Sequence, residues 1–424
     1  MTRLRASYLI ETSMAPADAA AIMAGEQSTG TFVKLAAETA EFSQLHAATV
    51  DSVEITGEVE GPSLPGAGVY PDADGKVTWR QARVDLSWPL DNLGLCLPTA
   101  MATVAGNLFE LRPMSGLRLL DVSFPPEFLS RYGGPGFGVE GTRRLAGVSD
   151  RPLIGTIIKP SVGLSAGATA EQVDQLCAGG IDFIKDDELQ ADGPHCPFDD
   201  RVRAVMPMIE RHADRLGRKP MFAFNVTGDP DRMRHRHDSA LEAGATCIMV
   251  SLNSVGVSGF LDIARHSQLP VHAHRNGWGY LSRHPMLGFS FVAWSRFWRL
   301  AGADHMHVNG LRNKFCEADE SVIASARSCL TPMFDSPDPP CTVMPVFSSG
   351  QTPAQAWDSF AALGSLDLIH AAGGGITAPP DGIGAGVRAL RHAWDAAAQG
   401  VGPVDAATQS AELRRALAFF GSRT

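Results

Sequence analysis

The segment Gly179-Gly180-Ile181-Asp182-Phe183-Ile184-Lys185-Asp186-Asp187-Glu188 joins two glycines, an apolar run and a cluster of charges. The glycines are typical of a helix end and the apolar run of a buried β-strand. Because side chains alternate along a strand, we expect Lys185 and Asp187 on one face and Asp186 on the other. Glu188 follows where the chain turns, so it can swing back toward Lys185 and Asp187.

A buried lysine beside two carboxylates has two interpretations. It can be a structural ion pair, or it can belong to a hard-cation site, because Mg²⁺ prefers oxygen ligands and keeps positions open for a substrate. Asp187 and Glu188 would supply two of those oxygens. Lys185 would supply a third only if CO₂ converted its amine to a carbamate, and burial favours the neutral amine with which CO₂ reacts.

Short apolar runs alternate with longer amphipathic stretches from about residue 150 onward, which predicts a parallel sheet. Eight runs are candidate strands: 153–159, 181–187, 221–227, 246–252, 270–275, 304–310, 342–348 and 367–372. Eight parallel strands close a (β/α)₈ barrel, and an open doubly wound sheet is the alternative. Polar residues end nearly every run and no Gly-x-Gly-x-x-Gly motif opens the first unit, so the pattern favours the barrel.

The preceding residues, 1–140, predict a separate α+β domain, and residues 141–424 the barrel with C-terminal helices. The boundary is expected near the Gly/Pro-rich segment 132–136. In the first domain the expected strands are 6–10, 31–35, 53–56, 84–88 and 117–122, and the expected helices are 16–24 and 97–111.

Composition excludes several classes of protein. The net charge of -10 and the lack of a basic stripe argue against a nucleic-acid partner. No apolar run approaches the roughly 20 residues of a membrane helix, and no secretion signal opens the chain. The seven cysteines show no CxxC spacing, which favours free thiols in the cytoplasm.

The ends of the candidate strands carry most of the reactive side chains. Lys159 ends the first run, and the fifth and sixth carry two histidines each, at His272 and His274 and at His305 and His307. A single histidine in an apolar strand is more often a core residue than a catalyst. Two such pairs on successive strands reverse that preference, because histidine titrates near neutrality and can move protons.

Glycine-bearing turns follow the last two runs, at Ser348-Ser349-Gly350 and at residues 373–375. Such turns let backbone N–H groups approach an anion, and the corresponding loops are the usual phosphate site of these barrels. Tight turns without a ligand are the alternative. Lys314, after the sixth run, is either a mobile lysine that closes over a ligand or a solvated loop residue.

Taken together, these motifs resemble ribulose-bisphosphate carboxylase (RuBisCO) and, more closely, its RuBisCO-like relatives, over nearly the whole chain. The resemblance implies a ferredoxin-like N-terminal domain and Mg²⁺ held by a carbamylated Lys185 with Asp187 and Glu188. It also implies that Lys159 is the enolising base. The other barrel residues that match the family's catalytic, ligand or phosphate contacts are His274, Arg275, His307, Lys314, Ser348, Gly350, Gly374 and Gly375.

In the N-terminal domain the segments 25–32 and 106–109 resemble family segments that complete the partner subunit's active site. The resemblance therefore implies an obligate homodimer with shared active sites, in which Glu26, Thr31 and Asn107 act across the interface.

Four positions depart from the carboxylase pattern. Ser161 stands where carboxylases have a second lysine, Phe32 where tryptophan is usual, Trp278 where they have a further histidine, and Ser349 where they have a glycine. We therefore expect no functional CO₂-fixing carboxylase.

The retained residues suit Mg²⁺-assisted enolisation of a phosphorylated sugar or sugar acid. The expected activity is that of a transcarboxylase/hydrolase acting on 3-oxo-isoapionate 4-phosphate. The alternatives are an isomerase or enolase acting on 5-methylthioribulose 1-phosphate in methionine salvage, and a non-catalytic ligand-binding relative.

Overall fold

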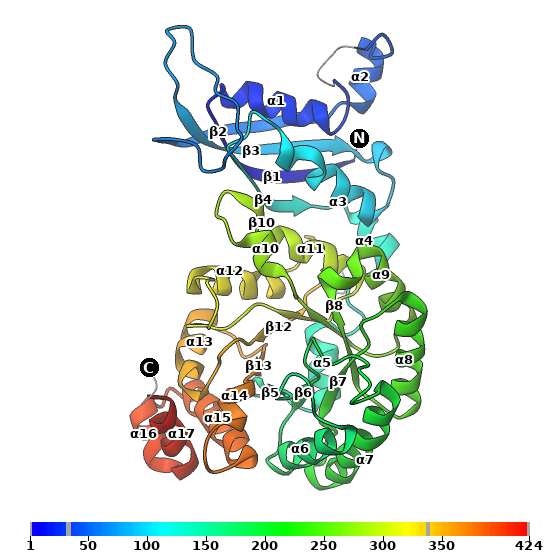
Figure 1. Ribbon diagram of the computed structural model, residues 1–424, viewed down its shortest axis with the longest axis vertical. Helices are drawn as coiled ribbons and strands as arrows, with labels where there is room; N and C mark the ends of the chain where they lie inside the picture. The colour runs from blue at the N-terminus through cyan, green and yellow to red at the C-terminus, as the bar shows by residue number, and fades with distance from the viewer. Residues whose placement is uncertain (1, 31–34, 336–339, 422–424) are drawn as a thin grey trace. The chain divides into compact units, whose positions relative to one another are not determined.

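The computed structural model describes residues 2–30, 35–335 and 340–421 of the chain. These residues form two compact units, Met1–Gly133 with Gly277–Leu300 and Gly134–Asn276 with Ala301–Thr424 (Figure 1). Residues 277–300 thus pack with the first unit, although they lie between two barrel strands in the sequence.

The first unit is built on a mixed sheet with the strand order β10-β4-β1-β3-β2. Four neighbours in that sheet, β4-β1-β3-β2, are antiparallel, and α1 and α3 are the crossovers, which is the expected ferredoxin-like arrangement. β10 adds a parallel edge strand beside β4. The bounds are β1 Arg3–Thr12, α1 Pro16–Glu26, α2 Ala40–His46, β2 Thr49–Val59, β3 Trp79–Pro89, α3 Leu97–Ala105, β4 Gly116–Ser123, α4 Pro126–Tyr132, α10 Trp278–Ser282, β10 Leu287–Phe289 and α11 Phe291–Ala301.

Local sequence explains these elements. In β1 the alternate side chains Leu4, Ala6, Tyr8 and Ile10 are buried, as a strand with one covered face requires. Pro16 begins α1 at a position where its missing N–H costs no helical hydrogen bond. The expected strand at 31–35 falls largely on residues outside the described part of the chain.

The second unit is a closed parallel barrel with the order β11-β12-β13-β5-β6-β7-β8-β9, in which β9 pairs with β11. All eight candidate runs contain one of its strands, so the predicted (β/α)₈ barrel is confirmed and the open sheet is excluded. The strand bounds are β5 Leu153–Ile157, β6 Phe183–Lys185, β7 Met221–Asn225, β8 Cys247–Ser251, β9 Val271–His274, β11 His305–His307, β12 Met344–Phe347 and β13 Ile369–Ala371.

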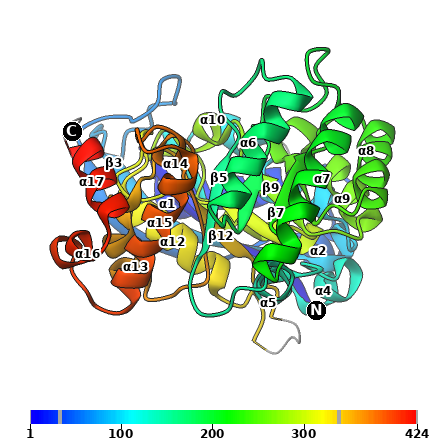
Figure 2. The same cartoon turned by 90° about the horizontal axis from the view of Figure 1, so that it is seen from below.

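Helices surround this barrel on the outside (Figure 2). Their bounds are α6 Ala166–Ala178, α7 Phe198–Leu216, α8 Pro230–Glu242, α9 Leu252–His266, α12 Asp319–Leu330, α13 Ala356–Leu363, α14 Gly373–Thr377, α15 Ile383–Ala398, α16 Pro403–Gln409 and α17 Ala411–Gly421. A further helix, α5 Gly138–Ala146, packs against the core inside the barrel. Across the described ranges, none of the helices combines the length and apolar character of a membrane span.

The interior of the barrel is packed with side chains from its strands, including Phe183, Met221, Met249 and Ile369, and Ala146 of α5 joins this core. The filled interior leaves the carboxyl ends of the strands as the place where polar residues can meet a ligand.

Candidate active site

Lys185 ends β6 in a buried position, with only 1% of the residue exposed. Its Nζ donates a hydrogen bond to the Asp186 carbonyl oxygen at 2.7 Å. Burial lowers the Lys185 pKa to about 8, although the nearby carboxylates of Glu188 and Asp187 act in the opposite direction. Near neutral pH a minor fraction of the Lys185 amine is therefore uncharged, and this fraction can react with an electrophile such as CO₂.

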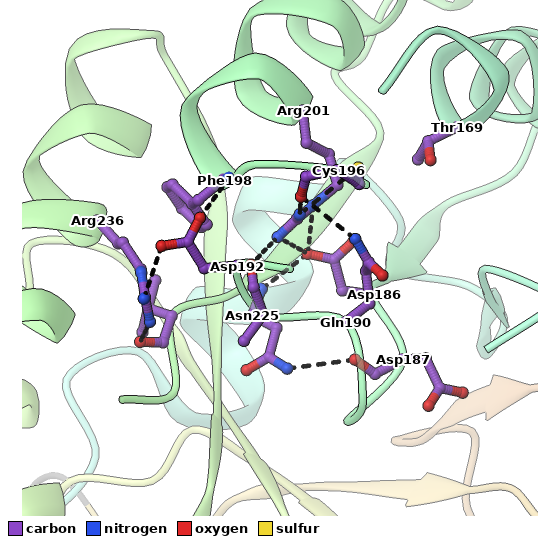
Figure 3. Close-up of polar contacts among 12 residues, drawn as sticks. Thr169, Asp186, Asp187, Gln190, Asp192, Cys196, Phe198, Arg201, Asn225 and Arg236 are labelled. Atoms are coloured by element: carbon purple, nitrogen blue, oxygen red, sulfur yellow. Dashed lines mark hydrogen bonds and ion pairs between the residues drawn. The ribbon is translucent and has the colours of Figure 1, made fainter. Parts of the chain in front are cut away.

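Asp186 and Asp187 point in opposite directions, as strand alternation predicts (Figure 3). Asp186 lies 3.1 Å from the guanidinium of Arg201 on α7, and both side chains are fully buried. Asn225 supports the same turn, since its Nδ2 lies 3.2 Å from the carbonyl oxygens of both Asp187 and Glu188. No sequence motif singles out Arg201, which is one of several arginines in an amphipathic helix.

Lys159, at the end of the first barrel strand, pairs with Asp187: Lys159 Nζ lies 2.5 Å from Asp187 Oδ2. The same amine donates to Ser161 Oγ at 2.9 Å, so the serine that replaces the carboxylase lysine helps to orient Lys159. Burial alone would raise the Asp187 pKa, but the Lys159 hydrogen bond and the charge of Lys185 hold it below its usual value. Asp187 is therefore an ionised carboxylate that is available to a cation once Lys159 moves.

The donor set at this turn suits a hard cation. Asp187 and Glu188 offer carboxylate oxygens, and Glu188 Oε2 lies 3.5 Å from Nε2 of His274. Among the described residues, no histidine, cysteine or acidic side chain joins Asp187 and Glu188 as the third member of a compact ligand cluster. A carbamate on Lys185 would add a third anionic oxygen ligand to these two carboxylates.

A second polar cluster, formed by His237, Asp238 and His266, brings three ligand atoms together. The backbone N–H of Gln268 donates to His237 Nε2, which leaves the proton of the neutral ring on Nδ1, facing Asp238. A ring in this state offers no lone pair to a cation at Nδ1. The cluster is better described as a carboxylate held by two histidines.

The strand histidines differ from the expectation in one respect, because burial lowers the pKa of His272, His274 and His307 well below 6.5. Burial likewise lowers the pKa of His305 to about 3. The rings therefore do not titrate near neutrality, and they serve as neutral hydrogen-bonding groups. His274 and His307 lie in contact, with 4.7 Å between their ring centroids.

Arg275 forms an ion pair with Glu317, a residue that no sequence motif singles out. Its guanidinium lies 2.7 Å from Glu317 Oε2, and the same oxygen accepts a hydrogen bond from Asn309 Nδ2 at 2.7 Å. An anionic ligand that binds Arg275 would compete with Glu317.

The glycine-bearing loops after β11, β12 and β13 meet at the carboxyl end of the barrel. The backbone N–H of Lys314 donates to the Ser349 carbonyl oxygen at 3.2 Å. A Cβ on Gly375 would lie 2.1 Å from the Gln351 carbonyl oxygen, so only glycine allows this approach. A Cβ on Gly350 would lie 3.4 Å from Lys314, and one on Gly374 would meet nothing within 4 Å.

Three expected site residues belong to the first unit. Asn107 Nδ2 lies 3.4 Å from Glu26 Oε1, so the structure brings these two exposed side chains together. Thr31 lies outside the described residues. Trp278, which replaces a carboxylase histidine, is buried among Phe291 and Trp294, so it fills an aromatic core.

Comparisons with known proteins place this geometry in context. Residues 138–420 match the ribulose bisphosphate carboxylase large chain, catalytic domain, and residues 4–128 match the N-terminal domain of that large chain.

Two relatives are named as enzymes. The chain is 55% identical to the 3-oxo-isoapionate-4-phosphate transcarboxylase/hydrolase of Xanthobacter autotrophicus, over 99% of each chain. It is 41% identical to the 3-oxo-isoapionate-4-phosphate decarboxylase of Rhizobium rhizogenes, over 98% of this chain and 97% of that one. The crystal structure of a RuBisCO-like protein from Burkholderia fungorum superposes with a TM-score of 0.90 at 45% identity, covering 99% of this chain and 100% of that chain.

Proposed function

The chain belongs to the ribulose bisphosphate carboxylase large-chain family, among its RuBisCO-like members, and from this we propose that it is a 3-oxo-isoapionate-4-phosphate transcarboxylase/hydrolase. The observation that carries the proposal is the 55% identity to a relative of that name over 99% of both chains. The buried lysine-carboxylate turn supplies the chemistry that such an enzyme needs.

We assign a Mg²⁺ ion to Asp187, Glu188 and a carbamylated Lys185. Bound there, the ion would polarise a substrate carbonyl and stabilise negative charge on its oxygen. The proposal is supported by the two adjacent carboxylates, Asp187 and Glu188, which offer the oxygen ligands that Mg²⁺ prefers. It is also supported by the lowered Lys185 pKa of about 8.

Lys159 is the candidate base. In the structure its amine is held by Asp187. When Asp187 turns to a cation, Lys159 is released from this ion pair. Site assembly and release of the base are thereby coupled through one carboxylate. His274 and His307, as neutral rings, would position substrate hydroxyls.

Arg275, Lys314 and the glycine-bearing loops are the proposed binding groups for the charged parts of the substrate. A carboxylate or phosphate requires such cationic and N–H donors, whereas the thiomethyl group of a methionine-salvage substrate would require an apolar pocket. The cationic residues at this end therefore favour the sugar-acid phosphate.

We further propose that the protein acts in the cytoplasm as a homodimer with shared active sites. Glu26 and Asn107 are exposed and adjacent in the first unit, as residues that meet a partner subunit would be. The seven cysteines, an odd number without CxxC spacing, are in keeping with a reducing compartment.

The test uses 3-oxo-isoapionate 4-phosphate labelled with ¹³C in its carboxyl group, incubated with the protein, Mg²⁺ and bicarbonate and followed by ¹³C NMR. Retention of the label in an organic acid product is the expected result. Release of the label as CO₂ would instead identify a decarboxylase, the activity that names the 41% identical relative. No turnover of this substrate, with turnover of 5-methylthioribulose 1-phosphate, would favour the salvage enzyme, and no turnover of either would favour a ligand-binding protein.

A further inference from the structure

A continuous chain of hydrogen bonds runs through the interior of the barrel, beneath the candidate site. It begins at Thr142 of α5, whose Oγ1 lies 2.9 Å from His305 Nε2. His305 Nδ1 then lies 3.4 Å from His272 Nδ1, and His272 Nε2 lies 2.8 Å from His307 Nε2. The chain ends at Ser348, whose Oγ lies 2.9 Å from His307 Nδ1.

This hydrogen-bond chain crosses the barrel from one end to the other. His305 is the first residue of β11 and His307 the last, while Ser348 directly follows β12. Thr142, His272 and His305 have no exposed surface, so bulk water does not reach the chain at its lower end.

The lower end of the chain is anchored to the backbone. The Thr142 hydroxyl donates to the Gly138 carbonyl oxygen one helical turn earlier. The start of α5 is itself fixed, because the N–H groups of Phe137 and Gly138 donate to Asp304 Oδ1 at 2.6 and 2.8 Å. The other oxygen of Asp304 accepts from the N–H of Val271 at 2.8 Å, which ties the helix to the beginning of β9.

This anchor determines the direction of every proton in the chain. A neutral imidazole has one N–H donor and one acceptor nitrogen. The position of the proton on one ring therefore determines which nitrogen of the next ring carries the proton. Because the Thr142 hydroxyl donates its proton to the Gly138 carbonyl, its oxygen can only accept, and it accepts from His305 Nε2–H. His305 Nδ1 must then accept from His272, and His272 Nε2 must accept from His307. The remaining nitrogen, His307 Nδ1, accepts the Ser348 hydroxyl proton.

We propose that Thr142 is a positioning residue for the active site, acting through His305 and His272 to hold His307 in its Nε2–H tautomer. The rings are neutral, as this requires, because burial lowers the pKa of His272, His305 and His307 below neutrality.

The direction of the chain decides what the barrel mouth offers a substrate. With its proton committed to His307, Ser348 presents lone pairs and accepts a hydrogen bond. Ser348 would then bind a donor, such as a substrate hydroxyl, rather than a phosphate oxygen. This part rests on the proposed function, whereas the tautomer of His307 does not.

The opposite direction is the structural alternative. In that state His307 Nδ1–H donates to Ser348 and the Ser348 hydroxyl turns to Ser349 Oγ, 3.4 Å away. It also requires Thr142 to abandon the Gly138 carbonyl and donate to His305. The backbone-anchored state keeps that bond, so it is favoured.

The test compares three variants by neutron diffraction of deuterium-exchanged crystals, which locates the proton on each ring nitrogen. Thr142→Val removes the acceptor of His305 Nε2–H, so all three rings should reverse together and His307 should carry its proton on Nδ1. Thr142→Ser keeps the hydroxyl and should keep the wild-type tautomers.

Thr169→Val is the matched control. Thr169 on α6 is also buried and its hydroxyl also donates to the carbonyl four residues earlier, at 2.9 Å, but no histidine of the described residues is hydrogen-bonded to it. This control separates loss of a helical back-bond from loss of the hydrogen-bond chain. Its histidine tautomers should remain those of the wild type.

Steady-state kinetics with 3-oxo-isoapionate 4-phosphate provide a second measurement. Thr142→Val should raise KM roughly tenfold, as the loss of one substrate hydrogen bond would, while Thr142→Ser and Thr169→Val should leave KM unchanged. An Nδ1–H tautomer of His307 in the wild type, or an unchanged tautomer in Thr142→Val, would overturn the proposal. Complete inactivity of the wild type on this substrate would overturn the proposed function but leave the diffraction test intact.

Discussion

At the scale of single residues, burial is the main cause of the shifted pKa values at the candidate site. Lys185 is a lysine enclosed at the end of a strand, and its enclosure lowers the pKa to about 8 from the ordinary 10.5. The strand histidines are shifted in the same way, toward their neutral forms. At neutral pH the site thus contains neutral histidines and a lysine of which a minor fraction is uncharged, before any ligand binds.

The first prediction concerns the formation of a carbamate on Lys185. Because only the neutral amine reacts with CO₂, the initial rate of carbamate formation at fixed dissolved CO₂ should rise with pH and reach half of its maximum near pH 8, the pKa of Lys185. ¹³C NMR with ¹³CO₂ would measure it. Lys185→Met, which has no amine, should show no such signal and no Mg²⁺-dependent turnover. A Lys185→Met enzyme with full activity would contradict the carbamate role.

The second prediction concerns Ser349, which has a positive φ of 70° and donates to Asn309 Oδ1 at 2.7 Å. Ser349→Gly relieves the backbone strain but loses the hydrogen bond, and these effects of about 1 kcal/mol each should nearly cancel. Ser349→Ala keeps the strain and loses the bond, so it should lower the free energy of unfolding by about 1 kcal/mol. Urea denaturation measures both. Equal stability of the two variants would show that the strain is not significant.

At the scale of elements, the turn after β6 is held from outside the barrel. Arg201 of α7 neutralises Asp186, and it also donates to the carbonyl oxygens of Ala191 and Cys196 at 2.7 and 3.1 Å. The helix that covers the strand therefore fixes the backbone from which Asp187 and Glu188 project.

The third prediction compares two arginines of α7. Arg201→Met leaves Asp186 buried without its partner and should lower the free energy of unfolding by about 3–5 kcal/mol. Arg203, two residues away, pairs with Asp200 in solvent, with side chains that are 73% and 50% exposed. Arg203→Met should therefore change the free energy by less than about 0.5 kcal/mol. Similar losses in both variants, measured by urea denaturation, would contradict a specific role for the buried pair.

Sequence patterns predicted the barrel strands because each apolar run is short, bounded by turns and followed by polar residues. They also predicted the opposite orientations of Asp186 and Asp187, since alternation is a local property of a strand. They did not reveal Arg201, Glu317 or Thr142. Each of these residues gains its role from a partner on another element, and nothing in its own neighbourhood marks it.

At the scale of the whole molecule, the chain divides into two units, each with its own sheet. The proposed metal and base residues all lie in the second unit, whereas Glu26 and Asn107 lie in the first. In the proposed dimer, each active site takes residues from both subunits.

The fourth prediction tests this arrangement with two inactive variants, Glu26→Gln and Lys185→Met. When they are co-expressed, half of the dimers should be hybrids, and each hybrid should contain one intact site. The mixture should then recover about a quarter of wild-type activity, as expected for a twofold dimer with shared sites. Each variant alone is the control. No recovery in the mixture, with hybrids demonstrated by mass spectrometry, would contradict the shared site.

The sequence by itself determined the barrel and the lysine-carboxylate turn, because these depend on hydrophobic period, turn residues and local motifs, while the family resemblance implied the ferredoxin-like arrangement. Only the tertiary structure decided the protonation states and partners: the neutral histidines, the pairing of Lys159 with Asp187 and of Arg275 with Glu317, and the hydrogen-bond chain from Thr142 to Ser348. The physical reason is that desolvation and hydrogen bonding depend on which distant residues enclose a group, and spacing along one chain does not specify that enclosure.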